Sequence, residues 1–196
     1  MLNLSPPLIL ASTSVYRREL LQRFRIPFEV VAPHVDETPM PAETPQDLAS
    51  RLALAKAHAV AKNRPEAVVI GSDQVVNLRG ECLGKPGTHE KAFHQLQRLS
   101  GHEVFFETAV AVICLNNNFQ NHELVRIRVQ FRELGDVEIE NYLRAETPYD
   151  CAGSAKSEGL GITLLEVIES NDPTALVGLP LIATSRMLRQ AGLKFF

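Results

Sequence analysis

The sequence predicts an α/β fold built around a mixed, twisted β-sheet. A short apolar run at residues 8–11 is followed by a Ser/Thr-rich turn and a helical pattern, which together indicate a β–α unit. An apolar, β-branched run at 67–71 is typical of a buried central strand. Two β-rich runs at 103–115 and 123–131, on either side of a turn region at 116–118, indicate a long antiparallel hairpin. Because β–α units favour parallel strands and a hairpin is antiparallel, the sheet should be mixed.

The first strand, at 8–11, is followed by a helix and a second strand. Residues 16–24 have helical spacing, with Leu20 and Leu21 on the apolar face. Residues 28–32 are again apolar and short enough for a strand, and the segment after them is a polar loop.

A long helix is expected to begin after Thr44. Thr44 is a good N-cap, Pro45 suits the first helical position, and Asp47 is placed to complete a capping box. The helix should end near Asn63, just before Pro65.

A hairpin and another helix follow the central strand at 67–71. The β-rich runs 75–78 and 81–83 flank Arg79-Gly80, a plausible hairpin turn. Thr88 is the expected cap of the next helix, which should stop at Ser100-Gly101.

After the long hairpin, the pattern predicts a helix at 136–144, a strand at 162–168 and a final helix at 181–191. The chain has no internal repeat, low-complexity segment or linker. A chain of 196 residues, 45% of them hydrophobic, can bury a large core as one domain or as two closely packed lobes.

Composition narrows the function classes. The formal net charge of −3 does not suggest a general nucleic-acid binder. The three cysteines are far apart and never in a CxxC pair, which argues against a disulfide framework and a zinc site. The sequence has no secretion signal and no run long enough to span a membrane, so we expect a cytoplasmic protein.

The turn after the first strand is a candidate phosphate-binding element. Backbone N–H groups at a helix N-terminus favour an anion, and the hydroxyls of Ser12 and Ser14 add donors. The guanidinium of Arg17 matches phosphate oxygens in two parallel bonds. In the alternative interpretation, Ser14 is only an N-cap and the arginine is solvated. Tyr16 lies beside this turn, where a base could stack on it, although it could equally be core packing.

Asp73 follows the apolar run at 67–71, and ligands of open α/β sheets bind at the carboxyl ends of strands. There it could hold a divalent cation or accept a proton from an attacking water, or it could simply cap a turn. Lys56, which borders the apolar stripe of the long helix, and Lys85, between Gly84 and Pro86, could neutralise phosphate oxygens. Neither lysine is persuasive alone, because most lysines are solvated.

The segment 153–161 contains three glycines and is either a loop shaped for close approach to a ligand or a flexible connector. It lacks the GxGxxG spacing of a dinucleotide site. The six histidines form no pattern typical of a metal cluster.

Taken together, these segments resemble the Maf family of nucleoside triphosphate pyrophosphatases. The matching segments run in order through the whole chain: LILASTS and YRREL, VDE, the long helix with Lys56, IGSDQVV, GKP, CAGS and KSEGLGI, and LVGLPL. The last two, and SDQ in place of a Thr-containing variant, resemble the branch that acts on 7-methyl-GTP. The resemblance implies one Maf-like domain over residues 1–196, with helices on both sides of the sheet and two closely packed lobes around a central cleft, as in ITPase-like folds.

The resemblance also implies the roles of individual residues. Asp73 aligns with the proton acceptor of the family. Three residues align with specificity positions: Tyr16, Gln74 and Glu158. Five residues match the positions that lie near the phosphates and the metal: Ser12, Arg17, Glu37, Lys56 and Lys85. The interpretation of the turn as a phosphate-binding element adds Ser14 to the expected phosphate-binding residues. The implied cofactor is a divalent cation, usually magnesium or manganese, with Glu37 and Asp73 as its expected ligands. Val15 stands where the family usually has proline, so the turn should be less rigid.

The expected activity is hydrolysis of 7-methyl-GTP to 7-methyl-GMP and diphosphate, which would remove a modified nucleotide from the pool. N7-methylation makes guanine positive, and a positive ring favours an aromatic face and a nearby carboxylate, here Tyr16 and Glu158. One alternative is a pyrophosphatase for dTTP, UTP or another modified nucleotide. Another is a nucleotide-binding regulator of septum formation or growth with little turnover. The expected partner is a small nucleotide, without nucleic acid or membrane, and a homodimer is a common state for such proteins.

Overall fold

The first strand, β1 (Leu8–Ala11), is buried along its whole length and therefore needs cover on both faces. Its side chains alternate, as strand geometry requires. Leu8 and Leu10 belong to one apolar cluster, and Ile9 and Ala11 belong to a second. The sheet therefore separates two cores.

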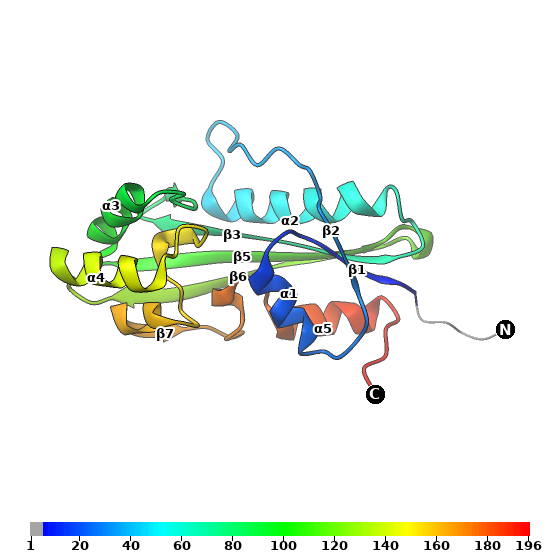
Figure 1. The fold of residues 1–196 in the computed structure, drawn as a ribbon. Helices are drawn as coiled ribbons and strands as arrows, with labels where there is room; N and C mark the ends of the chain where they lie inside the picture. Colours follow the sequence, from blue (N-terminus) through cyan, green and yellow to red (C-terminus); the bar gives the residue numbers. More distant parts are fainter. Residues whose placement is uncertain (1–5) are drawn as a thin grey trace.

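The structure is a computed structural model that describes residues 6–196 (Figure 1). The strands are β1 (Leu8–Ala11), β2 (Glu29–Val31), β3 (Val68–Leu78), β4 (Glu81–Leu83), β5 (Glu103–Cys114), β6 (Phe119–Phe131) and β7 (Leu165–Glu169). The α-helices are α1 (Val15–Gln22), α2 (Pro45–Ala61), α3 (His89–Leu99), α4 (Asp136–Glu146) and α5 (Leu181–Gln190). Short 3₁₀ helices cover Leu115–Asn117, Ala152–Ser154, Leu160–Leu164 and Ala175–Val177.

All seven strands form one mixed sheet in the order β2-β1-β3-β5-β6-β7, with β4 paired to β3. Strand β1 pairs in parallel with β2 and β3, and every other pairing is antiparallel. The expected mixed α/β sheet is thus confirmed.

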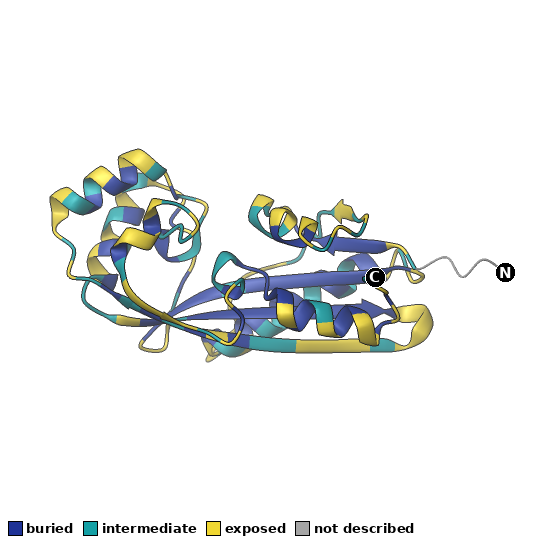
Figure 2. Cartoon of the chain, turned by 90° about the horizontal axis from the view of Figure 1, so that it is seen from below, coloured by how far each residue is buried: buried dark blue, intermediate teal, exposed yellow. Residues whose placement is uncertain are grey.

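Helices lie on both faces of this sheet. Helix α2 covers one face, and α1 and α5 lie against the other (Figure 1). Helices α3 and α4 pack together at the far end of the long strands, next to β7 (Figure 1). Figure 2 shows that the central strands are mostly buried, whereas each helix carries both buried and exposed residues.

The local signals for caps and turns are confirmed. Thr44 accepts a hydrogen bond from the backbone N–H of Asp47 (3.2 Å), although the Asp47 carboxylate accepts from the Thr44 hydroxyl rather than from its backbone. Arg79 and Gly80 both have positive φ (54° and 91°), as the tight β3–β4 turn requires. Gly101, also with positive φ (70°), follows α3.

Several expected strand boundaries were wrong, including the start of the strand expected at 123, which lies at Phe119. The strand expected at 67–71 continues to Leu78, because antiparallel pairing with β5 extends beyond the parallel pairing with β1. The strand expected at 162–168 begins only at Leu165, because 160–164 curls into a 3₁₀ helix whose Thr163 hydroxyl donates to the Leu160 carbonyl (2.7 Å).

Candidate functional site

A cleft of about 600 Å³ opens where the turn before α1, helix α2, strand β3 and the segment after α4 meet. It is lined by all ten residues that the sequence nominated: Ser12, Ser14, Tyr16, Arg17, Glu37, Lys56, Asp73, Gln74, Lys85 and Glu158. These residues come from six separate parts of the chain, so only the fold brings them together.

Asp73 does not lie where the sequence predicted it, just after a strand. It lies inside β3, opposite Ala109 of β5, and not in a loop after the strand. The last parallel pair between β1 and β3 is Ala11 with Gly71, so Asp73 lies just past the carboxyl end of β1. Its side chain is almost fully buried and lies within a strand, which excludes the alternative that Asp73 simply caps a turn.

A buried lysine joins two carboxylates in this cleft. The Nζ of Lys56 lies 2.6 Å from Oδ1 of Asp73 and 2.7 Å from Oε1 of Glu37. Lys56 is only 5% exposed, so α2 directs its ammonium inward rather than to solvent. Burying a lysine requires a compensating charge, and the two carboxylates supply it.

Glu37 and Asp73 form a sparse donor set for a divalent cation. Magnesium in proteins is commonly held by one or two carboxylates together with substrate phosphates. Here one oxygen of each carboxylate contacts the ammonium of Lys56. In residues 6–196 no three acidic, histidine or cysteine side chains group together as metal ligands. A divalent cation held by Glu37 and Asp73 would therefore need further ligands, such as phosphate oxygens.

The turn before α1 contains the N-cap that one of the two interpretations expected. The Ser14 hydroxyl accepts from the Arg17 N–H (3.4 Å), so Ser14 is the N-cap, and the Ser12 hydroxyl accepts from the Ser14 N–H (3.1 Å). Helix α1 begins at Val15, in the position where proline was expected. Both serines nevertheless line the cleft.

Arg17 is half-buried rather than fully solvated. Its Nε donates to the carbonyl of Gly178 at 2.8 Å. Burial lowers the pKa of this guanidinium, while Asp73 and Glu37 act in the opposite direction. Arginine remains protonated in proteins, so a cation faces the two carboxylates across the cleft.

Gln74 anchors a neighbouring segment to the sheet. Its Nε2 lies within hydrogen-bond distance of the Thr108 hydroxyl (2.9 Å) and of the carbonyls of Ala175 and Leu176 (both 3.0 Å). The nearby Ser72 hydroxyl interacts with the Gly178 carbonyl (3.0 Å). The LVGLPL segment therefore forms a wall of the cleft, a role that its sequence did not reveal.

Lys85 lies in the loop between β4 and α3 and is exposed to solvent in the cleft.

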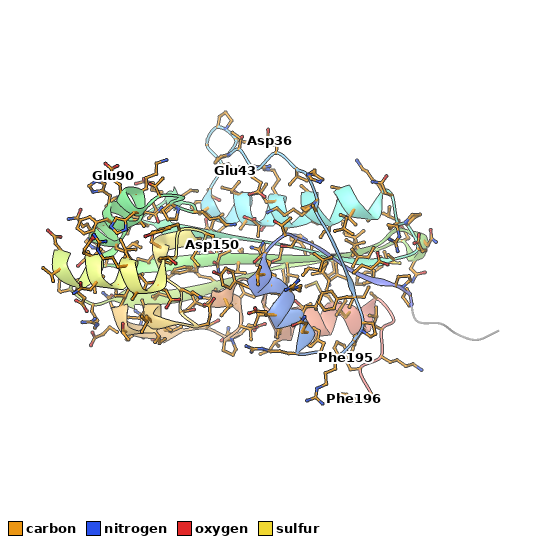
Figure 3. The ribbon with its side chains drawn as sticks, in the orientation of Figure 1. Asp36, Glu43, Glu90, Asp150, Phe195 and Phe196 are labelled. Carbon is orange, nitrogen blue, oxygen red and sulfur yellow. The ribbon has the colours of Figure 1, made fainter. Side chains whose placement is uncertain are left out.

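The two acidic residues of the VDE segment differ in their positions. Glu37 lines the cleft, whereas the Asp36 carboxylate accepts a hydrogen bond from the Thr38 N–H (2.9 Å). Figure 3 shows Asp36 and Glu43 on the loop that rises beside α2.

Tyr16 and the segment after α4 form a second group of side chains. The Tyr16 hydroxyl donates to Oδ1 of Asp150 at 3.2 Å, and the thiol of Cys151 lies 3.6 Å from the same hydroxyl. The Nζ of Lys156 lies 5.8 Å from the centre of the Tyr16 ring. Glu158 also lines the cleft. Figure 3 places Asp150 between α4 and α1.

Sequence reasoning missed Asp150 and Cys151. Asp150 occupies no motif position, and Cys151, although it begins the CAGS segment, was given no role. The hydrogen bond from Tyr16 spans 134 residues, so no local pattern could have indicated it.

Comparison with known proteins gives consistent results. The profile described as Maf-like protein matches residues 7–191. A protein from Polaromonas sp. strain JS666, named 7-methyl-GTP pyrophosphatase, is 66% identical over 98% of this chain and 88% of its own length. One from Albidiferax ferrireducens with the same name is 63% identical over 95% of this chain and 94% of its own length.

A solved structure, that of the Staphylococcus aureus Ham1 protein, overlaps 65% of this chain and 72% of its own chain, with a TM-score of 0.47 and 14% sequence identity.

None of the helices in residues 6–196 has the length and apolar character needed to cross a membrane. The family profile spans nearly the whole chain, and the relatives cover it almost completely at high identity. The chain therefore belongs to the Maf family.

Proposed function

We propose that this chain is a nucleoside triphosphate pyrophosphatase that hydrolyses 7-methyl-GTP to 7-methyl-GMP and diphosphate. One observation carries the proposal: a single cleft is lined by one group of three cationic side chains with Asp73, and by another group of a tyrosine with two carboxylates, Asp150 and Glu158. A triphosphate and a cationic base are complementary to these two groups. The names of relatives at 53–66% identity support the same substrate.

In this proposal, the phosphates are bound by Arg17, Lys56 and Lys85. Catalysis of phosphoryl transfer consists mainly of positioning and charge neutralisation, because the substrate carries about four negative charges. Arg17 and Lys56 are held in place by the protein itself, which lowers the entropy lost when phosphate binds. The serines of the turn before α1 add hydroxyl groups.

Asp73 is the proposed base. Lys56 contacts its Oδ1, while Oδ2 has no hydrogen-bond partner among residues 6–196. Oδ2 orients a water and takes its proton as the water oxygen attacks the α-phosphorus. The bond from that phosphorus to the bridging oxygen of the β-phosphate breaks, and diphosphate leaves with the electron pair.

A divalent cation, magnesium or manganese, is the proposed cofactor, held by Glu37 and Asp73 with the phosphates. When bound, it would neutralise developing charge on the phosphate oxygens. We expect Glu37→Gln to raise the magnesium concentration needed for half-maximal activity. The same variant should weaken manganese binding measured by electron paramagnetic resonance in the presence of nucleotide.

Incubation of the protein with 7-methyl-GTP, GTP, dTTP and UTP, with and without magnesium, tests the proposal through release of diphosphate. We expect 7-methyl-GTP to have the highest kcat/KM, and Glu158→Gln to reduce its advantage over GTP. A preference for dTTP or UTP would contradict the substrate assignment. Nucleotides that stabilise the protein but are never hydrolysed would support a regulator instead.

A further inference from the structure

Asp150 is a carboxylate on the cleft wall that belongs to none of the motifs. It lies in a turn after α4 in which the N–H of Cys151 donates to the carbonyl of Pro148 (3.2 Å). The carbonyl of Tyr149 accepts from the N–H of Gly87 (3.0 Å), which ties this turn to the loop before α3. The position of the Asp150 backbone is therefore fixed by its two neighbours.

The side chain of Asp150 contacts Tyr16 directly. The Tyr16 hydroxyl donates to Oδ1 of Asp150 (3.2 Å), and the Cys151 thiol is 3.6 Å from the same oxygen. Burial is the main cause that raises the pKa of Tyr16, so the phenol keeps its proton and remains a donor. Asp150 thus fixes the orientation of the ring on which a base would stack.

The charge of Asp150 is not neutralised by a neighbour. Among residues 6–196, neither Asp150 nor Glu158 forms an ion pair within 4.0 Å with a lysine, arginine or histidine. The nearby Lys156 has its own partner, Glu146, at 2.9 Å. Asp150, which contacts Tyr16, and Glu158, which lines the same cleft, are therefore two carboxylates without a direct ion pair.

We propose that Asp150 is a specificity-determining residue that favours nucleotides with a cationic base. It acts through its negative charge at the edge of the Tyr16 ring, together with Glu158. The inference rests on the proposed function, since it assumes that the base binds at Tyr16. It assigns the selectivity for N7-methylated guanine to a carboxylate pair rather than to Glu158 alone.

Binding of 7-methyl-GMP and GMP, measured by isothermal titration calorimetry at low ionic strength and mildly acidic pH, tests the proposal. Asp150→Asn removes the charge but keeps an oxygen that can accept from Tyr16. A unit charge about 4 Å away in water contributes roughly 1 kcal/mol, so the ratio of the two affinities should fall about fivefold. The fall should shrink at high salt because exposed charges are screened.

Matched variants separate charge from shape. Glu166→Gln removes an exposed carboxylate from β7, away from the cleft, and should leave the ratio unchanged. Tyr16→Phe removes the hydroxyl while keeping both carboxylates, so it should weaken both ligands more evenly. Lys156→Gln removes a cation near the ring and should raise the ratio.

Two results would overturn the proposal. One is an unchanged affinity ratio in Asp150→Asn, even if both ligands bind less tightly, because that would indicate a merely structural role. The other is equal binding of 7-methyl-GMP and GMP by the unmodified protein. Neither measurement depends on hydrolysis, so a failure of the pyrophosphatase assay would contradict only the proposed function.

Discussion

The carboxylate of Asp73 and the ammonium of Lys56 are both buried and lie 2.6 Å apart. Such a pair is costly to desolvate, and removing one partner leaves an uncompensated charge. A desolvated carboxylate with a specific charge partner in a cleft is a candidate functional group. The Asp73–Lys56 pair, together with Glu37, is therefore the centre of the proposed catalytic site.

Replacement of Asp73 by asparagine is the sharpest test at this site. Asparagine keeps the shape but cannot accept a proton, so kcat should fall by about 10²–10⁴. Nucleotide affinity should change much less, since the cations remain. Stopped assays and calorimetry measure the two quantities, and a near-normal kcat would remove Asp73 from its assigned role.

Cys151 provides a pH-dependent signal in the cleft. Burial raises the pKa of its thiol to about 11, and only the thiolate reacts with alkylating reagents. At pH 8 roughly one thiol in a thousand would be ionised, so iodoacetamide labelling should be slow and should accelerate up to about pH 11. Mass mapping with Cys151→Ser as the control checks this, and rapid labelling at pH 8 would contradict the raised pKa.

At the level of elements, the packing of α2 against β3 sets the position of Lys56. Gly71 permits this contact because a Cβ there would lie 2.2 Å from the Ala53 carbonyl oxygen and 2.6 Å from the Ala57 nitrogen. Both atoms belong to the α2 backbone, which cannot move without moving Lys56. The absence of a side chain at Gly71 thus permits the close approach of α2 to β3.

We expect Gly71→Ala to destabilise the protein by at least about 2 kcal/mol, because overpacking against backbone cannot be relieved by a rotamer change. Urea denaturation followed by circular dichroism measures this. Gly84→Ala, where a Cβ meets nothing within 4 Å, is the matched control. Equal stability of the two variants would show that α2 is not held by this contact.

For the whole molecule, the cleft is formed by segments that are far apart in the sequence. It is lined by residues of α1, α2, the 176–178 segment, the β4–α3 loop and the segment after α4. A nucleotide that contacts all of these walls should stabilise the entire fold, since ligands that bind only the folded state shift the unfolding equilibrium.

Thermal unfolding of the Asp73→Asn protein with 7-methyl-GTP tests this coupling without turnover. At about 100 times Kd the ligand contributes roughly 2.7 kcal/mol, which should raise Tm by about 5–10 °C for a domain of this size. 7-methylguanosine, which lacks the phosphates, should have a much smaller effect at the same concentration. Equal shifts by both would argue against phosphate binding by Arg17, Lys56 and Lys85.

The sequence by itself determined the mixed α/β class and most helix and strand positions, because caps, turns and apolar periodicity act over a few residues. The N-cap of α2 at Thr44 and the turn at Arg79-Gly80 are examples. The sequence also nominated ten residues that the fold gathers into one cleft. Their roles remain predictions.

Tertiary structure alone decided what depends on contacts between distant segments. The pairing of β3 with β5 placed Asp73 inside a strand, and no local signal marks where parallel pairing with β1 ends. The same holds for the bond from Tyr16 to Asp150 and for the inward direction of Lys56. These contacts join residues 17 to 134 positions apart, and they form only when the sheet and α2 are assembled.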